Sequence, residues 1–442
     1  MKTTIRIIST SKFRFLRLLF KIRADILYLL KIDWKALHFE GLLLYLWEII
    51  KVTEKNYMTF RARLDQLRHR NMDISKKKAK ERNVLKKYNY YNLVNGYKDP
   101  FLVASSERPR GFSNEDYYIS GTTPSNLESL MKFDESLRNI ILINVLKIED
   151  RIKNEIVQSF YKFYIRNNHK LKKTLHQESE YLRRNYYDLT NTKTQVLREE
   201  RGFIWTYING FNQLPQTNSQ SVNIGKVYNI DRKKTYETFV SLVYKTIGTQ
   251  RGKNNSVDSY LDNHKYIPMW VLMNILSFGN ISQFFLFQNK EIQKETIVNL
   301  TSNSTPDMAD IIGFGRVLHI LGIYRNLCAH NERIYCSKIK VPIDDEFMGF
   351  GTYLPFNNDV VKLSNTQFLN RRKAKKRKRA RNGIYACMFA TSLFLNKREL
   401  NKFKNDIDKQ LNHLKKQIGT EAYNKVVKIA GLDFDWKTLL VK

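Results

Sequence analysis

Cysteine, proline and glycine are all scarce in this chain, which has three, 8 and 18 of them among 442 residues. Cys328, Cys336 and Cys387 form an odd, sparse set, which argues against a disulfide framework and favours a reducing compartment, the cytoplasm. Two of them bracket His330, but zinc sites use paired Cys or His ligands at short spacing, and such pairs are absent. We therefore expect ordinary thiols, no metal site and no cofactor.

Long uninterrupted apolar runs are also missing, which argues against a signal peptide and a membrane-spanning helix. The segment GLLLYLWEII, residues 41–50, is apolar but too short to span a bilayer. Residues 1–31 carry a basic residue every few positions, so a basic amphipathic membrane contact by residues 12–35 is an alternative. We favour a cytoplasmic protein in which residues 1–57 either pack on the core or are a dispensable upstream extension that the cell does not normally translate.

Acidic residues are few relative to basic ones: 42 Asp and Glu against 76 Lys and Arg, a formal net charge of +34. Such an excess repels itself without a polyanion, and phosphate neutralisation by Lys and Arg releases counterions. We expect a nucleic acid as the partner; an anionic membrane surface and plain solvation are the alternatives. Aromatic residues, 13% of the chain, can stack bases, although most Phe residues are expected in the core.

Apolar residues recur mainly at the helical period of three and four, which predicts an all-α fold. The clearest stripe lies in the segment from Met131, and KYIPMWVLMNILSFGNISQFFLF, from Lys265, predicts a buried helix, a Phe-Gly-Asn turn and a second helix. A helix is expected after Thr305 as N-cap, with Pro306 in its first turn. Two more helical stretches follow Asn382. Strands are suggested only near residues 221–230.

Two segments resemble insertions between helices, residues 166–262 and 338–381. The second ends in RRKAKKRKRAR, where nine of eleven residues are basic. This run is either a solvated loop or a phosphate clamp, and the overall charge favours the clamp.

The densest chemical clue is GIYRNLCAHNERIY, residues 322–335. Arg325 and His330 are five residues apart, about 140° on a helix, so they do not share one face. The pair fits a helix end, where the two side chains converge on a groove. The preceding apolar stripe comprises Phe314, Val317, Leu318, Leu321, Tyr324 and Cys328. Arg325 borders this stripe, so its charge lies near a buried surface.

These are the groups needed to cleave RNA without a metal, because RNA carries its own nucleophile, the 2′-hydroxyl. A His can take or give a proton near neutral pH. An Arg can bind the non-bridging phosphate oxygens as charge develops on them, and an Asn can orient the phosphate or the His. No carboxylate cluster for two metals is evident, which makes a metal-dependent nuclease the less favoured alternative.

The block RNLCAHNERIY resembles the signature of the Abi-like family, the bacterial abortive-infection proteins of AbiD and AbiF type within the HEPN superfamily. Further blocks are similar to that family in the same order: ARLDQLRHRNMDI from Ala62, YNYYNLVNGYKDPF from Tyr88, FDESLRNIILINVLKIEDRIKNEI from Phe133, IPMWVLMNILSFGNIS from Ile267, and NGIYACMFATSLFL from Asn382.

The resemblance implies a HEPN-type helical bundle and a phage-defence ribonuclease that leaves 2′,3′-cyclic phosphate ends. It assigns catalysis to Arg325, Asn326 and His330. It adds Glu149 as a weaker candidate, for which a plain salt bridge to Arg151, Lys153 or another base is an equal alternative. A HEPN nuclease usually places two motifs face to face, so one motif per chain implies a homodimer. The rival hypothesis is a non-catalytic RNA-binding regulator.

RNA is expected as the substrate, with a bound regulatory RNA as a further candidate partner, and RNA binding is assigned to a separate basic set. Its members are Arg333, Arg371, Arg372, Lys373, Lys375, Lys376, Arg377, Lys378, Arg379 and Arg381. Three parts are expected: residues 1–57 as a helical extension of unclear role, 58–130 as an N-terminal Abi-like region, and 131–442 as the HEPN-like domain with both insertions. A protein beginning at Met58 is expected to fold and to retain activity.

Overall fold

The chain divides into two compact units, residues 1–65 and 66–442. The computed structural model describes residues 57–75, 79–112, 115–190, 192–196, 207–209, 227–340, 343, 347 and 379–440. Only residues 57–65 of the first unit are described, and they contain the start of helix α3 (Phe60–His69), where the Thr59 hydroxyl accepts from the Ala62 N–H. The predicted extension therefore lies outside the described residues except for Tyr57.

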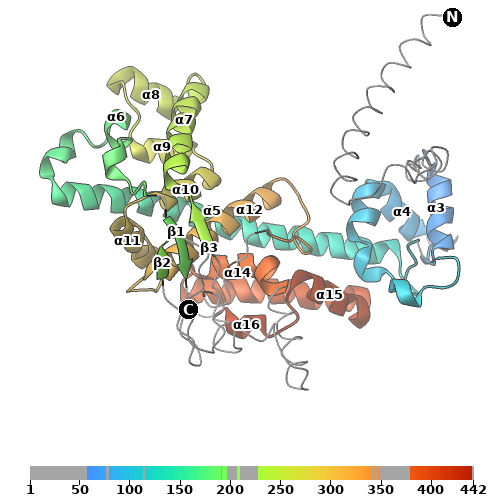
Figure 1. Cartoon of the computed structure of the whole chain (residues 1–442). Helices are drawn as coiled ribbons and strands as arrows, with labels where there is room; N and C mark the ends of the chain where they lie inside the picture. Colours follow the sequence, from blue (N-terminus) through green and yellow to red (C-terminus); the bar gives the residue numbers. More distant parts are fainter. Residues whose placement is uncertain are drawn as a thin grey trace, which may run out of the picture. The chain divides into compact units, whose positions relative to one another are not determined.

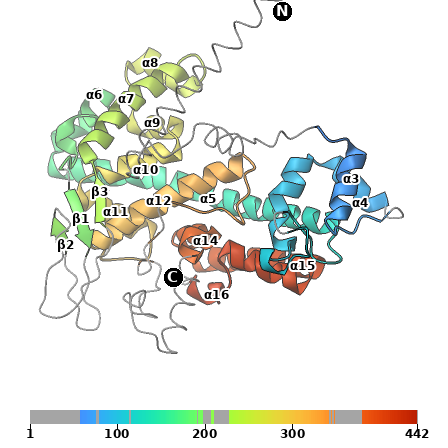
Figure 2. The ribbon, with the colours of Figure 1, turned by 45° about the vertical axis from the view of Figure 1, so that its right-hand side comes forward.

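The described residues are mainly helical, which confirms the all-α class (Figures 1 and 2). The helices after α3 are α4 (Ala79–Lys87), α5 (Pro124–Asn167), α6 (Glu178–Tyr181), α7 (Arg232–Gln250), α8 (Asn255–His264), α9 (Met269–Ile275), α10 (Phe278–Leu286), α11 (Lys290–Leu300), α12 (Met308–Ala329), α14 (Ile384–Ser392), α15 (Lys397–Ala430) and α16 (Trp436–Leu439). Short π- or 3-10 turns are η2 (Tyr91–Asn95), η3 (Asp99–Phe101), η4 (Ser105–Glu107), η5 (His169–Lys173) and η6 (Arg184–Tyr186).

A small antiparallel sheet is the exception to the helical fold. Strands β1 (Thr192–Val196), β2 (Tyr207–Asn209) and β3 (Val227–Ile230) are ordered β2-β1-β3. Thr194 of β1 pairs with Asn209 on one side and with Tyr228 on the other. The sequence prediction of strands near residues 221–230 is confirmed for β3, whereas β1 and β2 were missed.

Helix α5, 44 residues long, is the central element of the second unit. It begins at a capping box in which Thr123 and Asn126 satisfy each other's backbone N–H groups, with Pro124 in the first turn, where its missing N–H costs nothing. Of the predicted stripe, six residues are buried and two, Ile140 and Asn144, are only half-buried. The buried residues are Phe133, Leu137, Ile141, Val145, Ile148 and Ile152. Helix α5 packs against α11, α12, α14 and α15, which all come from the C-terminal half of the chain.

The start of α14 and the end of α15 approach each other so closely that both contact points are glycines. Gly431 ends α15 in the left-handed region, with a φ of 74°. A Cβ on Gly431 would lie 2.6 Å from the carbonyl oxygen of Arg379, and one on Gly383 would lie 2.8 Å from that of Ala430. Any larger residue at either position would push the two helices apart.

Two predicted helix boundaries were wrong by a few residues. The N-cap of α12 is Asp307, whose side chain forms a capping box with Asp310, so Thr305 is not the N-cap and Pro306 precedes the helix. Between α9 and α10 the chain breaks at Leu276, and Ser277 caps α10 through its hydroxyl. Phe278, which the sequence placed in a turn, is therefore already helical.

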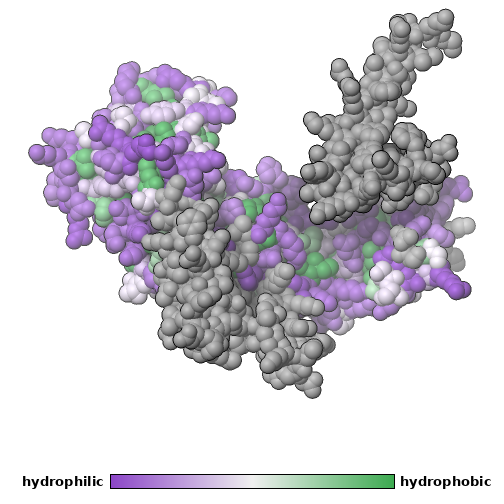
Figure 3. All heavy atoms as spheres, in the orientation of Figure 1, coloured by the Kyte–Doolittle hydropathy of each residue, from purple (hydrophilic) through white to green (hydrophobic). Residues whose placement is uncertain are grey.

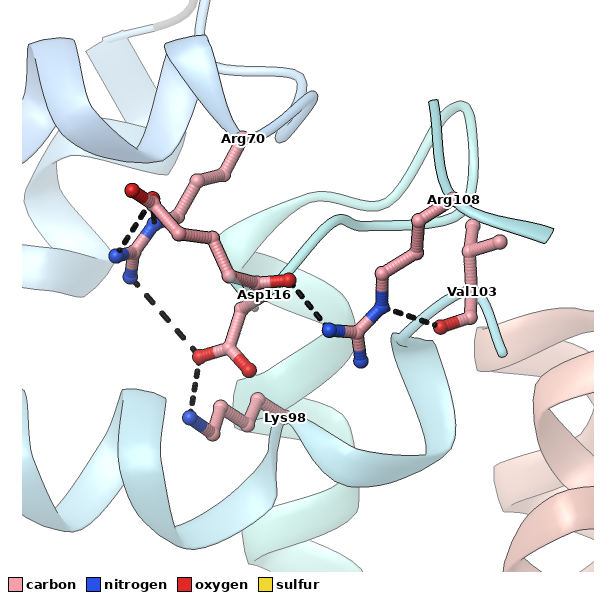
Figure 4. A network of polar contacts seen from close by, with 6 residues as sticks. Arg70, Lys98, Val103, Arg108 and Asp116 are labelled. Atoms are coloured by element: carbon pink, nitrogen blue, oxygen red, sulfur yellow. Dashed lines mark hydrogen bonds and ion pairs between the residues drawn. The ribbon is translucent and has the colours of Figure 1, made fainter. Parts of the chain in front are cut away.

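A network of ion pairs and hydrogen bonds holds the loop that precedes α5 (Figure 4). Arg70 donates to Glu115 at 3.1 and 3.2 Å, while Lys98 pairs with Asp116. Arg108 donates from Nε to the carbonyl of Val103 at 3.1 Å. The loop has little regular structure of its own, so these contacts are what ties its described residues together.

Among the described residues, no helix combines the length and apolar character needed to cross a membrane.

Candidate active site at the end of helix α12

The Arg-Asn-x3-His motif lies where α12 ends. The predicted apolar stripe, Phe314, Val317, Leu318, Leu321, Tyr324 and Cys328, is buried. The helix stops at a Schellman turn: the Glu332 N–H bonds the Leu327 carbonyl at 2.9 Å, and the Asn331 N–H bonds the Cys328 carbonyl at 3.3 Å. Asn331 is in the left-handed region, with a φ of 57°, which Asn tolerates better than most residues. His330 is thus the C-cap residue, as expected for a motif at a helix end.

Arg325 is paired with the one acidic candidate on the neighbouring helix. Its Nε lies 3.5 Å from the Glu149 carboxylate of α5, and the Glu149 side chain is only 6% exposed. The same carboxylate accepts the Lys153 ammonium at 2.7 Å. Two cations therefore share one buried anion and leave one net positive charge at this point. The salt-bridge alternative for Glu149 is present in the structure, but one of its two partners is Arg325.

Asn326 and His330 are both exposed, and they are four residues apart on one face of α12. Within the described residues no side-chain hydrogen bond is found for either of them. Arg325 is half-buried, at 37% exposure, and borders this face. The arrangement exposes the His330 imidazole and the Asn326 amide to solvent, beside the Arg325 guanidinium that is paired with the buried Glu149. Such a surface can receive a phosphate.

The chain that follows the motif is anchored by Asp134, a fully buried residue of α5 that the sequence did not single out. Its Oδ1 accepts the backbone N–H groups of Ile334 and Tyr335 at 3.1 and 2.8 Å. Its Oδ2 accepts from Arg138 at 2.6 Å and from the Tyr97 hydroxyl at 3.1 Å.

Burial raises the pKa of Asp134, while these donors oppose the rise. Arg138 also donates to the Glu332 carbonyl at 3.3 Å. One buried ion pair therefore fixes the exit of the turn that holds His330.

The predicted RNA-binding residues that are described have partners within the protein. Arg333 donates to the Gly96 carbonyl and covers that glycine. Arg379 pairs with Asp433, and Arg381 donates to the Ile343 carbonyl at 3.0 Å. Residues 371–378 of the basic run lie outside the described residues.

The cysteines near the motif are free thiols, and burial raises the pKa of Cys328 to about 12. Its thiol therefore stays protonated near neutral pH and is a poor nucleophile. In the described part of the chain, no group of three or more His, Cys, Asp or Glu is arranged to hold a metal ion.

A family model described as "Abi-like protein" matches residues 83–336, more than half of the chain. The chain belongs to the Abi-like family. The match includes Glu149, Arg325, Asn326 and His330, and it ends directly after the segment anchored by Asp134. The blocks from Ala62 and Asn382 lie outside it. No curated protein and no solved structure matches the chain. Membership in the Abi-like family associates the protein with abortive infection, a form of phage defence.

Proposed function

We propose that this Abi-like protein is a HEPN-type endoribonuclease that cleaves RNA without a metal ion during abortive infection. The observation that carries the proposal is the pairing of Arg325 with buried Glu149 at a helix end that exposes His330. A half-buried cation beside an exposed imidazole matches the two needs of RNA cleavage, which are charge stabilisation and proton transfer.

In the proposed reaction the 2′-oxygen of a ribose attacks the adjacent phosphorus. The new P–O2′ bond forms as the P–O5′ bond breaks, which leaves a 2′,3′-cyclic phosphate and a 5′-hydroxyl. One His330 imidazole takes the 2′-hydroxyl proton, and a protonated imidazole gives a proton to the leaving 5′-oxygen. Arg325 binds the non-bridging oxygens, whose negative charge grows as phosphorus becomes five-coordinate, and Asn326 orients the phosphate.

Glu149 acts in this scheme by holding Arg325. Its carboxylate is buried, so it keeps the guanidinium at the helix end without itself reaching the solvent face. Lys153 offsets the negative charge of Glu149, and the site keeps the positive balance that attracts RNA.

The reaction needs an acid and a base at the same time, whereas each chain has one motif. We therefore propose a two-fold homodimer in which both motifs line one cleft. The support is an apolar strip on α5 in which Ile143 is 57% and Leu146 42% exposed, beside the half-buried Leu142. Leu142 lies two turns from Glu149 on the same face of the helix. A second copy that covers this strip would lie beside the motif.

Cleavage of end-labelled RNA in excess chelator tests the mechanism. We expect cyclic phosphate ends, no cleavage at a linkage whose upstream nucleotide is 2′-deoxy, and loss of about a thousandfold or more in rate for His330→Ala, because proton transfer and its geometry are both lost. His319→Ala, an exposed histidine of the same helix, is the matched control. Cleavage of the 2′-deoxy linkage would exclude the mechanism, and RNA binding without any cleavage would favour the regulator.

A further inference from the structure

A surface run of aromatic rings lies outside the motif, on the lobe formed by α6 to α9 and the end of α5. We define the aromatic run as six residues: His176, Tyr266, His264, Tyr260, Trp270 and Tyr161. Successive ring centroids are 5.0 Å apart for His176 and Tyr266, 5.9 Å for Tyr266 and His264, and 5.3 Å for His264 and Tyr260. The Trp270 indole N–H donates to the Tyr260 hydroxyl at 3.4 Å, and its ring is 5.9 Å from Tyr161.

The aromatic run contacts a second, largely buried set of rings. Tyr161 leads into this set through Phe160, which contacts Tyr164, Tyr186 and Tyr187. Phe160, Tyr186 and Tyr187 of the inner set are buried, whereas the six rings of the aromatic run are all half-buried or exposed. Trp270 is 46% exposed and His264 is exposed, although burying an aromatic ring is strongly favourable.

The surroundings of the aromatic run are basic. Residues 161–190 and 231–270 contain 14 Lys and Arg against seven Asp and Glu. The turn η5 places the exposed Lys170, Lys172 and Lys173 just before His176, and Lys265 is exposed between His264 and Tyr266. Two of the acidic residues are occupied: Asp262 pairs with Arg251, and Asp258 accepts the Gly252 N–H. Figure 3 shows this lobe as mainly hydrophilic with small hydrophobic areas.

We propose that the aromatic run is a docking surface for single-stranded RNA, whose bases stack on the exposed faces of Trp270 and its neighbours. A protein partner would be expected to leave a broad apolar face, whereas here Lys265 and the lysines of η5 flank the rings, and rings with neighbouring cations are the composition that binds bases and phosphates together. Tyr161 and Glu149 are both on α5, twelve residues or about 18 Å apart along the helix axis. RNA held here is therefore within a few nucleotides of the motif. The inference rests on the proposed function only in taking RNA as the ligand.

Binding can be separated from cleavage by measuring it on a His330→Ala background of the full chain. The probe is a fluorescein-labelled oligouridylate of about 12 nucleotides, within the usual site size of such surfaces, with a duplex RNA of equal length for comparison. Trp270→Ala should weaken single-strand binding roughly tenfold or more, since one stacked base contributes that much, and should leave the salt dependence unchanged. Tyr91→Ala removes a ring that is 68% exposed elsewhere and should change binding less than twofold.

Trp270→Phe supplies a second measurement that does not depend on the loss of a side chain. It keeps a ring, so we expect most of the affinity to remain while the RNA-induced quenching of tryptophan fluorescence is lost. Equal binding by Trp270→Ala and the parent, equal losses for single strand and duplex, or quenching unchanged in Trp270→Phe would each overturn the proposal. A change of mass in light scattering for Trp270→Ala would assign the surface to a second copy instead. RNA that binds as expected but is never cleaved would refute only the ribonuclease.

Discussion

The end of α12 and the aromatic run are both proposed to meet RNA, yet different forces hold them in place. The motif depends on buried carboxylates: Glu149 holds Arg325, and Asp134 holds the chain after His330. The aromatic run has ring contacts and one weak side-chain hydrogen bond instead. A site that stabilises developing charge needs its charged groups fixed, and only paired charges can be buried. A stacking surface needs only the orientation of its rings, so it can be supported by packing.

The largest expected effect comes from breaking the anchor of the motif. Asp134→Ala should lower the free energy of unfolding by about 3–5 kcal/mol, because it leaves the buried Arg138 without its counter-ion and two backbone N–H groups without an acceptor. Urea denaturation measures the change. Glu135→Ala, next to it and exposed, should stay within about 0.5 kcal/mol. A similar small effect at both positions would show that Asp134 is not the anchor.

The second effect tests whether two copies share the site. Ile143→Asp combined with Leu146→Asp should convert a dimer into a monomer in light scattering and abolish cleavage, because the charges disfavour burial of the apolar strip on α5. Both side chains are exposed, so the melting temperature of the monomer should change little. The shared cleft would be contradicted if the wild-type protein is already a monomer in light scattering and the doubly substituted protein still cleaves RNA at the full rate.

The third effect separates the roles of the two partners of Glu149. Glu149→Gln should lower kcat roughly tenfold to a hundredfold, because Arg325 loses its fixing charge and about 1.4–2.7 kcal/mol of transition-state stabilisation. KM should change less. Lys153→Gln, which removes the other partner, should have the smaller effect on kcat. Equal effects of the two changes, or an effect on KM alone, would assign Glu149 to RNA attraction and not to the position of Arg325.

The smallest effect concerns the basic run. Neutralising the seven basic residues among 371–378, while keeping Arg379 and Arg381, should weaken RNA binding uniformly across sequences. The slope of log affinity against log salt should fall by about 0.7 for each lost phosphate contact with a single strand. Arg379→Gln alone should instead affect stability, since this residue pairs with Asp433. A changed cleavage position with an unchanged salt slope would refute the separation.

The sequence predicted those features that depend on local periodicity and chemistry. The stripe of α5 is such a feature, and so is the placement of Arg325 and His330 at a helix end, because a spacing of five excludes one helical face. The start of α12 was mispredicted because Thr305 and Asp307 can both cap a helix; the reciprocal bond with Asp310 favours Asp307, and only the structure shows it.

Features that join distant residues could not be predicted from one sequence. Asp134 lies 200 residues before Ile334, so the aspartate resembled one more polar residue of an amphipathic helix. The aromatic run gathers rings from residues 161 to 270, and their spacing in the chain has no common period. Strands β1 and β2 lack the alternation that identifies a strand.

The Schellman turn at the end of α12 has a consequence for how the motif tolerates change. A helix face repeats every turn, whereas a helix end occurs once, so the separation of the guanidinium and the imidazole is set by where the helix stops. Asn331 determines that stop through its left-handed backbone. Asn331→Gly should preserve the end of the helix, because glycine adopts the left-handed region easily. A β-branched residue at this position disfavours that region and should let the helix continue, so that each added residue is rotated by about 100° from the one before it. A residue without a chemical role in the cleavage thus sets the distance between the two catalytic side chains.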